Sequence, residues 1–446
     1  MKPSYGPTAS APLAPWHRWA KAGPLLMLAV FCAAFFGSNA AAAARDATVL
    51  HWNEIAVQAV GATPPFPSTR AMATVQVAVF EAINAITHRY EPYLGTISAP
   101  SDASEEAAAV AAAHDTLVWL FPAQQAFLDG KEAESLAALA TSADPAAIDE
   151  GTAVGKAAAA AMIAERANDG AQPPMFYTPA SVAPYAWQAT PACANAPANG
   201  RGLFFQWQFV KPFGVESSAQ FRVPAPPALV SGRYAKDLNE LAAVGDRSST
   251  LRPSDRADVA IFYAAQPPHR GWNLVARQLA AEHGGDEITT TARTLAILNM
   301  SLSDAHITVF ESKYHYTTWR PETAIARADE DGNPRTAPST AYQPFVTAPC
   351  FPSYPSAHGA GGGAARAVLE RAYGRKQHDI TLVEEAAPGI VLAYSDLRTI
   401  TDDVSDARVY GGIHFRYDQD AGEAMGVEVG HYNDEHRLRR LGPSEP

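Results

Sequence analysis

Apolar residues recur every three or four positions over most of the chain, which is the spacing of an amphipathic helix. Segments with this pattern cover residues 49–86, 102–168, 234–244, 252–265, 271–282 and 288–316, with proline-containing breaks at 64–67, 121–122 and 144–145. No alternating apolar and polar run of useful length is present, so we expect no strands. The pattern therefore predicts an all-α protein.

Composition changes between residues 171 and 231, where prolines are frequent and acidic residues are few. Long ordered loops of this kind commonly cover a site or another domain. We therefore predict two packed helical bundles, residues 45–170 and 232–446, joined by a proline- and aromatic-rich crossover over 171–231. The first bundle is alanine-rich, and we expect it to be scaffold.

The first 44 residues have the pattern of a secretory signal peptide. A basic segment with His17, Arg18 and Lys21 precedes an apolar run over 25–36 and small residues over 38–42. This run is shorter than the about 20 residues that a membrane span needs. We expect cleavage and a secreted or periplasmic protein; an uncleaved N-terminal anchor is the alternative.

The chain is acidic and has the composition of a globular protein. Hydrophobic residues make up 47% and charged residues 18%, and the net charge is −12. Without residues 1–44 the chain keeps 31 basic and 46 acidic residues, a net charge of −15. Such a surface argues against nucleic acid and against stable membrane association. The sequence leaves open whether the protein is a homo-oligomer.

Three short stretches in the last third carry polar residues that suit a bound anion: 313–321 (KYHYTTWRP), 352–359 (PSYPSAHG) and 408–418 (RVYGGIHFRYD). Lys313 and Arg320 are seven residues apart, which on one helix places both cations on one face about 10 Å apart. Pro321 disfavours helical geometry at Arg320 and is expected to end that helix there.

The second stretch predicts a helix that opens at Ser356, Ala357 and His358, where free N–H groups and a hydroxyl suit a tetrahedral anion. The glycines over 359–363 would let another helix or a bound group come close.

In the third stretch, we expect Arg408 on a loop and a break at Gly411 and Gly412. His414 and Asp418 then stand at i and i+4, so the carboxylate can hold one imidazole nitrogen.

Each feature alone has a simpler explanation: a single lysine or arginine is usually a solvated cation, a single histidine is more often structural, and PSYPS fits a plain proline-rich turn. Their combined order predicts one oxyanion pocket in the C-terminal bundle. Because the whole protein is acidic, a local group of cations indicates a buried site rather than a basic surface patch.

The order of these motifs resembles that of the vanadium-dependent haloperoxidases, which share it with the type 2 phosphatidic acid phosphatases and bacterial acid phosphatases. The resemblance implies that Lys313, Arg320, Ser356 and Arg408 bind the oxygens of vanadate or phosphate. It makes His414 the metal ligand or phosphate nucleophile and His358 the acid–base residue. Family members often have glycine where Ala357 stands; alanine keeps the N–H that touches the anion unless a positive φ is needed.

Two enzyme activities follow from this resemblance. In the first, vanadate on His414 serves as the cofactor and the substrates are hydrogen peroxide, a halide and an organic acceptor, with Lys313 polarising the peroxide. In the second, an acid phosphatase without a cofactor forms a phosphohistidine at His414, which Asp418 makes more nucleophilic. A non-enzymatic scaffold is a third reading, although every residue of the signature is present.

The peroxidase is favoured because the N-terminal helical segments also resemble the secreted haloperoxidases. Phe310 and Phe351 are further candidates for an apolar halide pocket, with the core as their alternative place. Two other features stay open: Cys193 and Cys350 form a disulfide or remain separate thiols, and Asp304 pairs with a pocket residue or is an ordinary polar position.

Overall fold

The computed structural model describes residues 33–95, 97–195, 197–283 and 287–442, with side chains from residue 46 onward. The chain divides into two units, Met1–Ala41 and Ala42–Pro446, and the fold below is that of the second unit. The predicted signal peptide lies outside the residues whose side chains are described. Over the described ranges, no helix combines the length and the apolar character needed to cross a membrane.

The described residues are mostly helical, as predicted. The α-helices are α1 (Ala33–Val60), α2 (Pro65–Thr87), α3 (Glu105–Leu120), α4 (Gln125–Leu139), α5 (Pro145–Arg166), α6 (Gly232–Val244), α7 (Ser254–Ala265), α8 (Pro268–His283), α9 (Ile288–Tyr316), α10 (Pro321–Ala326), α11 (Ala357–Tyr373), α12 (Leu397–Tyr410) and α13 (Arg416–His436). Short 3-10 turns are η1 (Pro122–Gln124), η2 (Pro191–Cys193), η3 (Phe205–Phe209) and η4 (Ala328–Glu330).

Helix α2 connects the two predicted bundles. Its side chains are buried along almost its whole length, because α3 and α5 pack against it and α9 runs along it as well. One hydrophobic core therefore contains Phe80 of α2, Val110 of α3 and Leu298 of α9. The scaffold helices thus support the long helix that carries Lys313.

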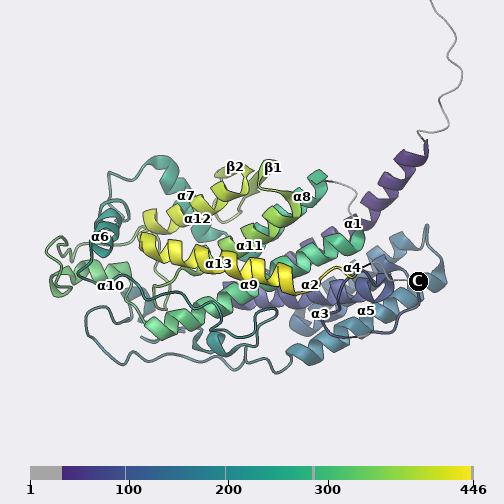
Figure 1. Ribbon diagram of the computed structural model, residues 1–446, viewed down its shortest axis with the longest axis horizontal. Coiled ribbons are helices and arrows are strands. Elements are labelled where there is room, and N and C mark those ends of the chain that lie inside the picture. Colours follow the sequence, from purple (N-terminus) through teal and green to yellow (C-terminus); the bar gives the residue numbers. More distant parts are fainter. Residues whose placement is uncertain (1–32, 96, 196, 284–286, 443–446) are drawn as a thin grey trace, which may run out of the picture. The chain divides into compact units, whose positions relative to one another are not determined.

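Helices α11 and α13 lie side by side next to α9 (Figure 1) and approach each other closely. A Cβ atom built on Gly426 of α13 would lie 1.9 Å from the carbonyl oxygen of Ala360, and one on Gly363 of α11 would lie 2.3 Å from that of Glu423. Side chains larger than hydrogen would push these helices apart, so the glycines of the second stretch do allow a close helix contact. This contact holds the 356–358 segment against the start of α13.

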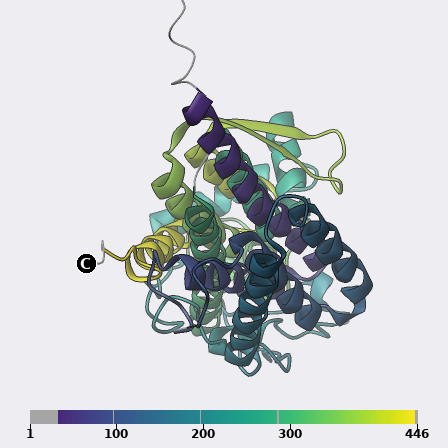
Figure 2. The same cartoon turned by 90° about the vertical axis from the view of Figure 1, so that its right-hand side faces the viewer.

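The prediction of no strands was wrong. Strands β1 (Lys376–Val383) and β2 (Val391–Asp396) form an antiparallel hairpin, which lies away from α3 and α5 in both views (Figures 1 and 2). In β1 the buried positions alternate, but the first of them is His378, so too few apolar residues mark the period. The hairpin is fixed to α8 because Gln278 exchanges two hydrogen bonds of 2.8 Å with the backbone of Thr381.

Asp304 holds the crossover in place and does not belong to the pocket. Its buried carboxylate accepts hydrogen bonds from the N–H groups of Phe213, Gly214 and Val215 at 2.7, 2.7 and 3.1 Å. It also accepts one from Asn433 of α13 at 3.1 Å. Burial raises the pKa of Asp304, and these four donors lower it in part.

Candidate active site

Lys313 stands in the last turn of α9 and clamps the loop that leads to α11. Its fully buried ammonium donates to the carbonyl oxygens of Pro352, Ser353 and Pro355 at 2.9, 2.7 and 2.5 Å. Burial, and after it the charge of Arg320, lowers the pKa of Lys313 well below its ordinary value. Since an ammonium has three donors, all are used, and Lys313 acts on a bound anion through its charge.

Arg320 does not share a helix with Lys313, so that prediction was wrong. Helix α9 ends at Tyr316, Thr317 takes a left-handed conformation with φ 48°, and Arg320 precedes α10 in an extended conformation. Pro321 thus begins a new helix, which is a favoured place for proline. The link turns the Arg320 side chain back toward Lys313.

The Arg320 guanidinium is buried at the centre of the pocket. Its Nε donates to the carbonyl oxygen of Phe351 at 2.7 Å, and one terminal nitrogen lies 3.1 Å from Nε2 of His414. The other terminal nitrogen has no hydrogen-bond partner in the described part of the chain. Burial lowers the pKa of Arg320 to about 9.

His414 is held in one orientation by Asp418. Its Nδ1 lies 2.9 Å from Oδ2 of Asp418, which also accepts the hydroxyl hydrogen of Ser353 at 2.6 Å. Burial, and after it the charge of Arg320, lowers the pKa of His414 well below its ordinary value, while burial raises the pKa of Asp418. Nδ1–H therefore donates to Asp418, and the lone pair of Nε2 faces the cations.

The start of α11 provides hydrogen-bond donors. Ser356 caps the helix by accepting from the N–H of Gly359 at 3.2 Å, and its own N–H donates to the carbonyl oxygen of Asp418 at 2.8 Å. Ala357 is the first helical residue and does not have a positive φ, so alanine fits where the family often has glycine. A helix leaves its first N–H groups without partners inside the helix, which suits an anion here.

Arg408 lies on the last turn of α12 rather than on a loop as predicted. The helix continues to Tyr410, and the chain turns only at Gly412, which has φ 80°. One terminal nitrogen of Arg408 donates to the carbonyl oxygen of Tyr263 at 3.4 Å, and its buried Nε has no partner among the described residues. Burial lowers the pKa of Arg408 to about 10.

His358 is partly exposed, whereas the other predicted pocket residues are buried. Its pKa is well below the ordinary value because of desolvation and, next in importance, the charge of Arg408. The imidazole is therefore neutral near pH 7 and can accept a proton. It also lines a small cavity between α7, α8 and α12.

Phe310 and Phe351 lie in an aromatic cluster behind the cations. Their rings are 5.2 Å apart, and Phe66 of α2 packs edge-on against both at 4.5 and 5.8 Å. Phe310 is fully buried, while the Phe351 ring lies 4.9 Å from the guanidinium of Arg320. Phe351 thus forms one wall of the pocket, and Phe310 supports it from the core.

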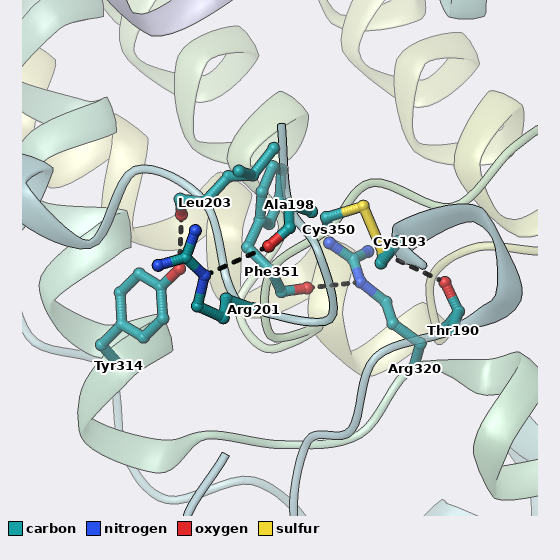
Figure 3. Close-up of a disulfide and its surroundings, with 9 residues drawn as sticks. All are labelled: Thr190, Cys193, Ala198, Arg201, Leu203, Tyr314, Arg320, Cys350 and Phe351. Carbon is teal, nitrogen blue, oxygen red and sulfur yellow. Dashed lines mark hydrogen bonds between the residues drawn. A yellow bond between two sulfur atoms is a disulfide. The ribbon is translucent and has the colours of Figure 1, made fainter. Parts of the chain in front are cut away.

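A disulfide between Cys193 and Cys350 joins the crossover to this wall. Figure 3 shows the bridge beside Phe351, the residue whose carbonyl oxygen accepts from Arg320. The N–H of Leu203 also donates to the carbonyl oxygen of Cys350 at 2.8 Å. Both contacts are made to Cys350, so the crossover is fixed directly beside the residue that orients Arg320.

The charges of the pocket do not balance without an anion. Lys313, Arg320 and Arg408 are buried together, and Asp418 is the carboxylate whose charge acts on the first two. Buried charges normally pair, and buried donors normally find acceptors. The unpartnered nitrogens of Arg320 and Arg408, with Nε2 of His414 beside them, therefore fit a tetrahedral oxyanion bound through a central atom to the imidazole.

Comparison with known proteins places this pocket in a family. Residues 293–441, which hold all the pocket residues named above, match the VCPO second helical-bundle domain. Over these residues the chain is homologous to the vanadium haloperoxidases. A vanadium chloroperoxidase from Curvularia inaequalis is 23% identical over 204 residues, which are 34% of this chain and 33% of that protein. The match thus spans about a third of the length of this curated relative.

Solved structures extend the likeness of fold to most of the chain. A bacterial vanadium-dependent iodoperoxidase is similar with a TM-score of 0.72 at 23% identity, covering 90% of this chain and 97% of that one. A bacterial vanadium-dependent chloroperoxidase in its holo form has a TM-score of 0.65 at 18% identity, covering 82% and 90%. The N-terminal helices are therefore part of the fold that this chain shares with vanadium haloperoxidases.

In this vanadium haloperoxidase homologue, sequence reasoning missed two residues that shape the pocket. Ser353 donates to the same Asp418 oxygen that His414 contacts. Phe66 packs against Phe351 in the aromatic wall, although it lies 285 positions earlier in the sequence. The serine stands in the quoted PSYPSAHG stretch and could have been considered. Nothing in the sequence around Phe66 indicates contact with the pocket.

Proposed function

We propose that the protein is a vanadate-dependent haloperoxidase that oxidises a halide with hydrogen peroxide. The reaction H2O2 + X⁻ + H⁺ → HOX + H2O breaks the O–O bond, oxidises the halide by two electrons and consumes one proton. The observation that carries the proposal is His414, whose Nδ1 is held by Asp418 while Nε2 faces a buried excess of positive charge. A homologous VCPO-type domain supports it.

Each pocket residue has a role in this proposal. Nε2 of His414 would hold the vanadium, and the free donors of Arg320, Arg408 and the first turn of α11 would hold the vanadate oxygens. Bound vanadate supplies a Lewis acid that activates hydrogen peroxide without changing its own oxidation state. Asp418 keeps the proton on Nδ1 of His414, so that Nε2 stays a ligand.

His358 and Lys313 complete the site. His358 is neutral near pH 7, because burial and Arg408 lower its pKa, so it accepts a proton from incoming peroxide and returns it to the product. Lys313 keeps the 352–355 loop in place and adds positive charge, which stabilises negative charge that develops on the reacting oxygens. An organic acceptor would then react with the hypohalous acid.

A phosphatase is the second candidate, because the bond between His414 and Asp418 also suits a nucleophilic imidazole. The peroxidase is preferred since the fold of the bacterial haloperoxidases covers 82–90% of this chain, including the N-terminal helices. We also propose export, on the basis of the signal-like N-terminus and the disulfide, which suits an oxidising compartment.

The test compares two activities of the purified protein after removal of bound anions. Bromide and iodide oxidation by hydrogen peroxide is measured as orthovanadate is added, and hydrolysis of p-nitrophenyl phosphate is measured without vanadate. The proposal expects halide oxidation that appears with vanadate and is suppressed by excess phosphate. Ester hydrolysis that vanadate inhibits, with no halide oxidation at any vanadate concentration, would establish the phosphatase instead.

A further inference from the structure

A small cavity beside His358 lies outside the oxyanion pocket. Its volume is about 20 Å³, which is enough for one water molecule or monatomic ion. Its lining consists of Tyr263, Gln266, Pro268, Gly271, Trp272, Val275, His358, Leu382, Ile400 and Val404. None of these described residues is a carboxylate, and most are apolar. The cavity is therefore a narrow apolar space that ends on the proposed acid–base residue.

Gln266 brings an unused hydrogen-bond donor to this cavity. The residue follows α7, its N–H donates to the carbonyl oxygen of Phe262 at 2.9 Å, and its side chain is only 5% exposed. Its amide nitrogen Nε2 is buried and has no partner among the residues that the structure describes. A buried amide donor without an acceptor is unfavourable, so a species that accepts hydrogen bonds is expected beside it.

Gly271 makes room for this side chain. A Cβ atom at Gly271 would lie 2.4 Å from Oε1 of Gln266, so any larger residue would displace the amide. The fixed backbone of Gln266 and the missing side chain at Gly271 thus place the amide at the cavity wall.

The electrostatic field at the cavity favours an anion. Arg408 donates to the carbonyl oxygen of Tyr263, a lining residue, and among the charged neighbours it has the largest effect on His358. With a neutral His358 and no carboxylate in the lining, this positive charge is not offset locally. Water needs acceptors as well as donors, whereas a halide needs only donors, a positive field and polarisable walls such as Trp272.

We propose that Gln266 binds the halide in this cavity and determines how strongly the enzyme holds it. The inference rests on the proposed haloperoxidase function and adds to it the position of the halide. The amide N–H of Gln266 donates to the ion, Arg408 contributes its charge from behind Tyr263, and His358 stands between the ion and the oxyanion pocket.

The test uses steady-state kinetics of the vanadate-loaded enzyme with three variants. Gln266→Leu removes the donor at similar size, and Gly271→Ala displaces the same amide. Gln124→Leu is the control, because it removes a glutamine amide of η1 that donates to the carbonyl oxygen of Ala59 in α1, and neither residue lines the cavity. We expect the KM for bromide to rise about tenfold in the first two, as for a lost hydrogen bond to a charged group, with the KM for peroxide unchanged. Gln124→Leu should keep both constants.

A binding measurement separates this inference from the proposed function. Crystals soaked in bromide should show an anomalous peak in the wild-type cavity and none in Gln266→Leu, whether or not the enzyme turns over. An active wild type with no bromide in the cavity, or an unchanged bromide KM in Gln266→Leu, would overturn the inference alone. An inactive wild type would overturn the proposed function, and the bromide peak would still decide whether the cavity binds a halide.

Discussion

Two histidines, one in each half of the molecule, have opposite surroundings. His114 of α3 is 2.8 Å from Asp115 through Nδ1 and 2.9 Å from Asp129 through Nε2, with Glu132 at 3.6 Å. In His414, Nδ1 contacts one carboxylate, that of Asp418, and Nε2 contacts the guanidinium of Arg320. Burial lowers the pKa of His114, but the carboxylates outweigh it and the net shift is upward, whereas the pKa of His414 falls.

The same contrast holds for the arginines. In the N-terminal helices, Arg70 pairs with Asp169 at 2.7 Å, and the buried Arg166 lies 3.7 Å from the same carboxylate. Arg320 and Arg408 have no carboxylate within salt-bridge distance among the described residues, whose pocket ion pair joins His414 and Asp418. The scaffold balances its charges internally, and the pocket leaves positive charge that an anion must balance. This difference separates the functional part of the molecule from its support.

The largest expected effect comes from exchanging the two histidines for alanine. His414→Ala should lower vanadate-dependent bromide oxidation by more than about 100-fold, because it removes the proposed ligand. Changes to residues that only orient a ligand cost about 10–100-fold. His114→Ala should leave the rate within about twofold, because His114 lies on α3 outside the pocket. Equal losses in both variants would remove the distinction between site and scaffold.

A smaller effect is expected at the residue that orients His414. Asp418→Asn should weaken vanadate binding about 10–100-fold, because the amide no longer holds a proton on Nδ1. Asp129→Asn serves as the control: it changes a carboxylate that contacts His114 as Asp418 contacts His414, and it should leave vanadate affinity unchanged. Binding is measured by equilibrium dialysis, and unchanged affinity in Asp418→Asn would contradict the assigned tautomer.

Anion binding should stabilise the pocket and not the scaffold. At a vanadate concentration about 100 times the Kd, the free energy of unfolding should rise by about 2.7 kcal/mol. The gain should shrink in Arg408→Gln and persist in Arg70→Gln, as measured by chemical denaturation with and without vanadate. A full gain in Arg408→Gln would show that the uncompensated charge is not what binds the anion.

The smallest effect concerns pH. The pKa of His114 is raised in the folded protein, so its contribution to stability is complete below the unfolded value of about 6.5 and is lost as the pH rises through the folded pKa. The loss in free energy of unfolding caused by His114→Gln should therefore become smaller as the pH rises from about 5.5 to about 8, a range on either side of the reference pKa of about 6.5. A destabilisation that grows over this range would contradict the raised pKa.

The two pocket histidines, His358 and His414, should have the opposite effect on the pH dependence of stability. The pKa values of His358 and His414 are lowered, so the folded protein loses stability relative to the unfolded chain as the pH falls below about 6.5. The wild type should therefore unfold more easily at low pH in the absence of an anion, and less so in its presence. An anion that makes no difference at low pH would contradict this reading.

Sequence periodicity predicted most of the helices, and α9 has the predicted bounds of 288–316. The order of the motifs was enough to predict that polar residues from three distant stretches, among them three cations, meet around His414. The backbone at Arg320 was predicted wrongly, because a left-handed Thr317 has no signature in the sequence and Pro321 suits either end of a helix. The positions of the Ser353 and Gln266 side chains depend on tertiary contacts that no local pattern records.

The most direct test of the account is a calorimetric titration of orthovanadate into the anion-free protein. The account predicts one tightly bound vanadate per chain in the wild type and in His114→Ala, competition by phosphate, and no tight binding in His414→Ala. Tight binding that survives in His414→Ala, or that disappears in His114→Ala, would contradict the claim that uncompensated charge around His414 forms the site.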